Sequence, residues 1–193
     1  MNPEGLQTKK QYIDKNALTK THNQMTMKKM LYLLVVLTMA ISGYGQTEDE
    51  YIKRGSEMNN AQNFNGAVDN FTKAIKINPK NSETYNSRGI AKLNIKDTVG
   101  AIADFSMAVK INKKYTEAYN NRGFVKLHMK DYNGAIADFS KALEIAPGFA
   151  EAYANRGFAQ IKLGQKERGC LDLKKAKQFG YNNVNNAILM YCD

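Results

Sequence analysis

Few side chains in this sequence have the chemistry of an active site. The histidines are His22 and His128, and the cysteines are Cys170 and Cys192. A hydrolase or transferase needs a nucleophile, a base and a group that orients the base, or else a cluster of metal ligands. The sequence has no HExxH motif, no CxxC motif and no glycine-rich phosphate loop. We therefore predict no enzymatic activity, no cofactor and no metal site, with His128 as a surface or groove residue.

The two cysteines have two possible structural roles. In an exported protein both would meet an oxidising compartment, where a disulfide between Cys170 and Cys192 is favoured. Such a bond would close a loop of about 20 residues and attach the end of the chain to the preceding helices. The alternative is two unpaired thiols, one of them an ordinary core residue.

Most of the chain after the first 47 residues repeats with a period of 34 residues. Tyrosine, glycine and alanine recur at this spacing, and a phenylalanine column has leucine in fourth place. A fixed period of this length is typical of stacked helical repeats. The columns are Tyr51, Tyr85, Tyr119 and Tyr153; Gly55, Gly89, Gly123 and Gly157; Ala74, Ala108, Ala142 and Ala176; and Phe71, Phe105, Phe139 and Leu173.

Each period is predicted to form two amphipathic helices. The second helices are expected to begin at Asn63, Asp97 and Asp131, whose side chains can accept hydrogen bonds from free amides of the first turn. Gln165 occupies this position in the fourth period and is a weaker cap. The glycine column falls inside the first helix, where glycine costs about 1 kcal/mol relative to alanine. We infer that glycine permits close approach of the paired helices.

These columns resemble the tetratricopeptide repeat, whose signature runs aromatic, Gly, Ala-x-x-x-Phe, Ala and Pro. The proline is present only as Pro79 and Pro147. The resemblance covers about residues 48–183 and implies an all-α, right-handed superhelix of four helix pairs, at 48–81, 82–115, 116–149 and 150–183. Residues 184–193 are predicted to form a capping helix, because a terminal repeat otherwise exposes its apolar face.

One column departs from the resembled family, which commonly has leucine immediately before the glycine. Arginine stands there in every period, and an aspartate recurs one residue before the aromatic column in the last three. A partly buried arginine needs an anion, and its planar fork suits a carboxylate. We predict structural ion pairs that set the register of the helices, with substrate recognition as the alternative. The residues are Arg88, Arg122 and Arg156, with Asp104, Asp138 and Asp172.

The resemblance also implies a concave groove lined by the first helices, which in the family binds an extended peptide or a partner helix. Asparagines at some groove positions can pair with a peptide backbone, and phenylalanines can contact its side chains. The alternative is that the asparagines are solvated surface residues. The groove positions expected to bind a peptide are Lys53, Asn86, Asn120, Asn121, Asn155, Phe124 and Phe158.

This resemblance implies a non-enzymatic protein-interaction module that binds a peptide or a partner protein segment. The alternative function is a structural or assembly subunit of a cell-envelope complex that contacts its partners through the convex face or the cap. The net charge of the chain is +10, and residues 1–46 carry six lysines and two acids, which leaves +6 for the repeats. No dense basic run is present, so we do not expect a nucleic-acid partner.

The N-terminal segment is expected to direct export. Lys28 and Lys29 precede an eleven-residue apolar run at 31–41, and small residues follow before Gln46. This order is similar to that of a secretory signal peptide at residues 27–45, and eleven apolar residues are fewer than the roughly 20 that a membrane span needs. A retained anchor and a cytosolic protein are the alternatives. Residues 1–26 are expected to be an upstream extension or a disordered segment, and the protein to be periplasmic, envelope-associated or secreted, as in an exported bacterial protein of this repeat type.

Overall fold

The computed structural model describes residues 26–31, 33–34 and 46–192 of the chain. Two compact units are present, Met1–Gln46 and Thr47–Asp193. In the first unit, residues 26–31 and 33–34 are helical and exposed. No helix among the described residues is long and apolar enough to span a membrane. The predicted extension up to residue 25 and most of the predicted signal peptide lie outside the described residues.

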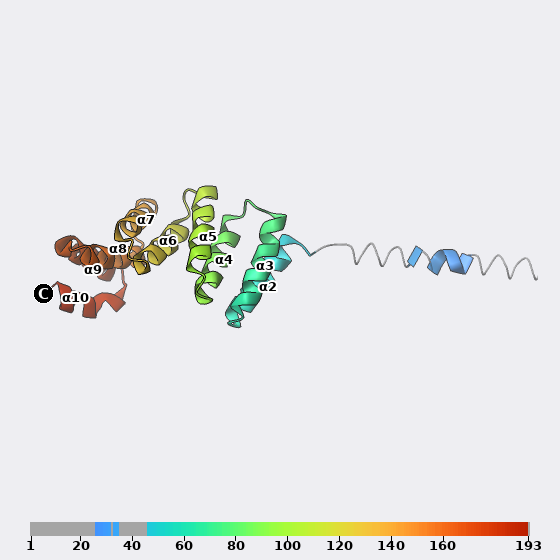
Figure 1. Ribbon diagram of the computed structural model, residues 1–193, viewed down its shortest axis with the longest axis horizontal. Helices are drawn as coiled ribbons and strands as arrows, with labels where there is room; N and C mark the ends of the chain where they lie inside the picture. The colour runs from blue at the N-terminus through green and yellow to red at the C-terminus, as the bar shows by residue number, and fades with distance from the viewer. Residues whose placement is uncertain (1–25, 32, 35–45, 193) are drawn as a thin grey trace, which may run out of the picture. The chain divides into compact units, whose positions relative to one another are not determined.

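The second unit is a series of antiparallel helix pairs, each packed on the next (Figure 1). All regular elements described in this unit are helices, so the predicted all-α solenoid fold is confirmed. A short 3-10 turn, η1, separates the last pair from the terminal helix. The elements are α2 (Glu48–Asn60), α3 (Phe64–Ile77), α4 (Ser82–Asn94), α5 (Thr98–Ile111), α6 (Thr116–His128), α7 (Tyr132–Ile145), α8 (Ala150–Lys162), α9 (Lys166–Gln178), η1 (Asn182–Val184) and α10 (Asn185–Tyr191).

Side-chain hydrogen bonds fix where the second helices begin. The side chains of Asn63, Asp97 and Asp131 each accept a hydrogen bond from the amide three residues later, at 2.9–3.0 Å. The predicted caps of α3, α5 and α7 are therefore confirmed. The side chain of Gln165 makes no such bond at the start of α9.

The glycine column makes room for the aromatic column. A Cβ atom added at Gly55 or Gly89 would lie 2.7 Å from the ring of Phe71 or Phe105, and one added at Gly123 would lie 2.8 Å from the ring of Phe139. These distances are shorter than van der Waals contact. The phenylalanine of each second helix thus lies directly on the glycine of its own first helix, and Phe71, Phe105 and Phe139 are almost completely buried.

Replacing Gly123 with alanine is expected to lower the free energy of unfolding by about 1–2 kcal/mol. The alanine gains about 1 kcal/mol of helix propensity, but its methyl group would lie so close to the Phe139 ring that we expect a cost of about 2–3 kcal/mol, the upper part of the range for overpacking. Urea denaturation followed by circular dichroism would measure the difference. Gly148→Ala is the matched control, because nothing lies within 4 Å of a Cβ atom there. If the two variants unfold at the same urea concentration, the packing argument is wrong.

The tyrosine column packs between successive pairs. Tyr85 and Tyr119 are buried in one apolar cluster with residues of the neighbouring second helices, including Val109 and Leu143. At the C-terminal end, Tyr153 is half-buried and its ring stacks on Phe179 at 5.7 Å between centroids. The tyrosines therefore belong to the core that joins the repeats.

The C-terminal segment covers the last helix pair. Val184 is completely buried, and Ala187 and Ile188 of α10 pack in the same cluster as Leu173 and Ala176 of α9. The helix α10 has seven residues and no charged side chain. This arrangement shields the apolar end of the array.

Candidate functional site

The first helices form a continuous row along one side of the array. The helix α2 contacts α4, and α6 contacts α8. Hydrogen bonds between asparagine side chains join α4 to α6 and α6 to α8. Side chains that point away from the second helices therefore share one face of the row, and we call this face the groove.

An apolar line runs along the groove. Ile90 on α4 is 37% exposed, Phe124 on α6 is 41% exposed, and Phe158 on α8 is half-buried. The three residues occupy the same position in successive repeats. Phe124 also packs edge-to-face with His128, with ring centroids 4.4 Å apart. Exposed aromatic side chains in a line are suited to contact the apolar side chains of a partner.

The asparagines of the groove bond mainly to one another. Asn121 donates to Oδ1 of Asn86 at 3.0 Å, and Asn155 donates to Oδ1 of Asn120 at 3.2 Å. Asn120 in turn donates to the carboxylate of Glu151 at 3.2 Å. Asn86, Asn120 and Asn155 are all buried. Asn121 is half-buried and is therefore the most accessible of the four asparagines. Peptide binding by these side-chain amides stays a prediction.

The groove has an acidic edge where the first helices begin. Glu83 and Glu117 are exposed there, one repeat apart. Burial raises the pKa of the Tyr115 hydroxyl, the charges of Glu83 and Glu117 raise it further, and the Asn86 side chain acts in the opposite direction. Lys53, the other predicted groove residue, is exposed on α2.

Two clefts open along the first helices. One, of about 150 Å³, is lined by residues of α2, α3 and α4 that include Ser56, Ser87 and Ile90. The other, of about 390 Å³, lies between the third and fourth repeats and includes Phe158 and Lys162. Phe158 was predicted for the groove and His128 for the surface or the groove, whereas Lys130 and Tyr132 come from the turn before α7 and from its first residue.

The arginine column forms networks that link successive repeats. Arg122 donates to both oxygens of Asp138, from Nε at 2.9 Å and from Nη2 at 2.6 Å. Its Nη1 donates to Ser106 of the preceding repeat at 3.3 Å. Oδ2 of Asp138 also forms an ion pair with Nζ of Lys126 at 2.8 Å. One guanidinium thus joins its own repeat to the one before it.

The same geometry recurs in the neighbouring repeats. Arg88 joins Asp104 and Thr72, and Arg156 joins Asp172 and Ser140. These contacts are internal and part-buried. Their geometry therefore favours a structural role for the arginine–aspartate pairs over substrate recognition. The serine and threonine partners, and the lysines Lys92 and Lys126, were missed in the sequence, although they recur with the same 34-residue spacing.

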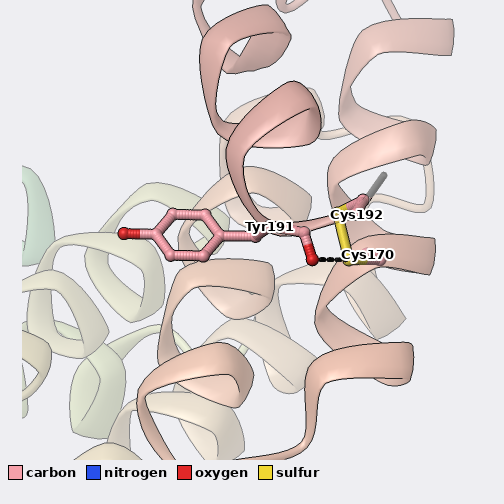
Figure 2. Close-up of a disulfide and its surroundings, with 3 residues drawn as sticks. All are labelled: Cys170, Tyr191 and Cys192. Atoms are coloured by element: carbon pink, nitrogen blue, oxygen red, sulfur yellow. Dashed lines mark hydrogen bonds between the residues drawn. A yellow bond between two sulfur atoms is a disulfide. The ribbon is translucent and has the colours of Figure 1, made fainter.

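The cysteines lie at the end of the array and away from the groove residues of the first helices. Cys170 on α9 and Cys192 after α10 form a disulfide, with their Cα atoms 5.5 Å apart (Figure 2). The carbonyl oxygen of Tyr191 lies 3.5 Å from Sγ of Cys170. Within the described residues, no group of histidine, cysteine, aspartate or glutamate side chains is placed to hold a metal ion.

Comparisons with known proteins identify the repeats. Two family models, both described as tetratricopeptide repeat, match residues 116–149 and 70–103. The first match coincides with the predicted third repeat, and the second begins within α3. These two segments of the chain therefore match the tetratricopeptide repeat, and members of that repeat family generally serve as non-enzymatic protein-interaction modules. No curated protein matches the sequence.

Solved structures share the fold. The crystal structure of MamA is 24% identical, covers 76% of this chain and 86% of its own, and has a TM-score of 0.69. YrrB, described as a TPR protein with an unusual peptide-binding site, is 22% identical over 71% of each chain, with a TM-score of 0.64. The first TPR of Spaghetti (RPAP3), bound to the HSP90 peptide SRMEEVD, is 25% identical over 62% of this chain and 94% of that chain, with a TM-score of 0.60.

Proposed function

We propose that this chain of tetratricopeptide repeats is a non-enzymatic module that binds a peptide or an extended segment of a partner protein along its groove. The observation that carries the proposal is the apolar line of Ile90, Phe124 and Phe158, which stays exposed or half-buried on three successive first helices. A group of exposed apolar side chains on one face is typical of a site that contacts another protein. The peptide-bound state of the Spaghetti repeat, which shares this fold, supports the proposal.

We also propose that the module works outside the cytoplasm, in the cell envelope or beyond it. The charged start and short apolar run of residues 27–45 have the order of a signal peptide. The Cys170–Cys192 disulfide supports the proposal, since such bonds persist mainly in oxidising compartments. N-terminal sequencing of the exported protein would test it, and a mature chain that starts near Gln46 is the expected result. A chain that keeps residues 27–45 would contradict cleavage.

A second candidate function is assembly through the cap. Leu171 on α9 and Leu189 and Met190 on α10 are 64%, 69% and 72% exposed, and they lie at the end of the array rather than in the groove. These side chains would suit contact with another subunit of an envelope complex. The groove and the cap carry different residues, so one experiment separates the two functions.

The experiment captures partners from an envelope extract with the full chain and with two matched variants. Phe124→Ala/Phe158→Ala shortens the apolar line of the groove, and Leu189→Ala/Met190→Ala shortens two exposed side chains of the cap. Circular dichroism should first show equal helix content in all three proteins. We expect the groove variant to lose the partner and the cap variant to keep it. The reverse result would favour assembly through the cap and contradict the groove proposal.

A further inference from the structure

The last of the second helices, α9, exposes a leucine that is surrounded by cations. Leu171 is 64% exposed. On a helix surface, the residues three and four positions away are the neighbours of a side chain. For Leu171, three of these four neighbours are basic and one is acidic. They are Arg168, Lys174, Lys175 and Glu167, and all of them are exposed.

The same outward positions differ from those of the other repeats. The buried columns of α9 are kept, since Leu173 and Ala176 are completely buried. In the first three repeats, glycine stands at the position of Arg168, serine or threonine at that of Lys174, and aspartate or alanine at that of Leu171. The outer face of α9 therefore carries an apolar residue and two cations that the repeat pattern does not account for.

Internal contacts do not explain the cations of α9. This helix has five cations and two acids, so its net charge is +3, half of the +6 of the repeats. Among the described residues, none of the five cations forms an ion pair, and Lys175 lies over the ring of Tyr153. Lys166 and Arg168 also stand in the first turn, where the helix dipole disfavours positive charge. Such a departure from a local rule is typical of a functional surface.

The cap adds apolar side chains at the same end of the array. Leu189 and Met190 of α10 are 69% and 72% exposed, and α10 has no charged side chain. The helix α10 packs against α9 at the C-terminal end (Figure 1). The disulfide joins Cys192 to Cys170, the residue before Leu171. Exposed apolar side chains from both helices are thus held close to the cations of α9.

We propose that this end of the array docks on a membrane surface that contains anionic lipids. The docking surface, which we call the terminal face, consists of Arg168, Leu171, Lys174, Lys175, Leu189 and Met190. Its apolar side chains enter the boundary between headgroups and acyl chains, and its cations contact the headgroup phosphates. The proposal goes beyond the groove function and leaves the groove free to bind a partner.

The composition of the terminal face favours lipid over a protein partner. Lysine is depleted in protein–protein interfaces, and their cores are depleted in charged residues generally. A helix that presents lysine and arginine around leucine is instead typical of binding to anionic lipids. A leucine that protrudes from a helix also needs a matching cavity on a protein, whereas fluid acyl chains adapt to its shape.

Co-sedimentation with vesicles tests the proposal. The vesicles contain phosphatidylcholine alone or an equimolar mixture with phosphatidylglycerol. The chain from Gln46 onward is used beside the full chain, because residues 47–193 form a compact unit and the apolar run at 31–41 can itself bind lipid. We expect both chains to prefer the mixed vesicles, with a preference that weakens at high salt. A preference in the full chain alone, or equal binding to both kinds of vesicle, would overturn the proposal.

A charge variant locates the effect on α9. Arg168→Gln/Lys174→Gln should weaken binding to mixed vesicles about 25-fold, since one cation near an anionic surface contributes roughly a factor of five. Lys76→Gln/Lys110→Gln is the matched control, because it changes the net charge equally at exposed lysines of α3 and α5. Circular dichroism should first show equal helix content. Equal weakening in the two variants would mean a general charge effect and would contradict the proposal.

An apolar variant tests insertion into the lipid. Leu171→Gln should weaken binding to mixed vesicles roughly tenfold, because its side chain no longer gains from leaving water. Val99→Gln is the matched control, since Val99 is 77% exposed on α5, outside the terminal face. If Leu171→Gln binds as the wild type does, the apolar part of the terminal face does not enter the membrane and the proposal is wrong.

The outcomes also separate this proposal from the groove function. Phe124→Ala/Phe158→Ala should bind vesicles as the wild type does, and loss of vesicle binding in this variant would move the membrane contact to the groove and overturn the proposal. Absence of vesicle binding would overturn it as well. If Arg168→Gln/Lys174→Gln then lost a partner captured from the envelope extract, the terminal face would bind an acidic protein instead.

Discussion

Replacing Asp138 with alanine is expected to lower the free energy of unfolding by about 3–5 kcal/mol, because removal of one partner from a buried ion pair leaves the other charge uncompensated. Asp138 is only 4% exposed. Its carboxylate accepts hydrogen bonds from Nε and Nη2 of Arg122 and forms an ion pair with Nζ of Lys126. The alanine variant would leave two partly buried cations beside an apolar cluster. It would also release the guanidinium that joins the third repeat to Ser106 of the second.

Asp69→Ala is the matched control for this prediction. Asp69 also pairs with a lysine, Lys73, at 2.7 Å, but both side chains are largely exposed. Exposed pairs contribute about 0–1 kcal/mol, so this variant should unfold almost like the wild type. Urea denaturation of both variants gives the comparison. Similar midpoints for Asp138→Ala and Asp69→Ala would show that the burial of the network has no energetic consequence.

The second large effect is expected at the disulfide. Cys170 and Cys192 are 22 residues apart, and a cross-link over a loop of that length stabilises by about 3 kcal/mol in the chain-entropy model. A Cys170→Ser/Cys192→Ser variant should lose about this amount. The loss should concentrate in the terminal segment, because η1 and α10 would then be held by the apolar cluster that contains Val184, Ala187 and Ile188.

Hydrogen exchange followed by mass spectrometry checks this expectation. In the serine variant, amides of α10 should exchange much faster, while amides of α4 to α7 should keep their protection. Reduction of the wild type with a thiol should reproduce the pattern and serves as the control for the substitutions. Unchanged exchange in α10 would mean that apolar packing alone holds the cap in place.

Much of the fold follows from the sequence, because each repeat encodes its own helices. The cap residues Asn63, Asp97 and Asp131 act within three residues, so their hydrogen bonds could be predicted from local spacing. The need for glycine at Gly123 was also evident from its cost inside a helix. What the glycine faces was not evident: the ring of Phe139 lies over it.

In the groove, the positions of single residues could be predicted, but the contacts between repeats could not. Phe124 and Phe158 could be assigned to the groove because the resemblance to the tetratricopeptide repeat implies which positions of the first helices line it. The bonds of Asn121 to Asn86 and of Asn155 to Asn120 could not, since the paired residues are 35 positions apart and meet only when the repeats stack. Lys130 and Lys162 of the second cleft likewise come from a turn of one repeat and a helix of the next, and the stacking of the repeats brings them to the same cleft.

The sequence by itself determined the number and type of the repeats, their helix pairs and the positions of the apolar faces, since these depend on interactions over a few residues and on a strict period. Only the tertiary structure decided how the repeats touch one another. It placed Ser106 and Asp138 on the same guanidinium and buried Asn86, Asn120 and Asn155. The physical reason is that the distance and angle between stacked helices, set by packing of the whole array, determine which polar groups pair and which remain free for a partner.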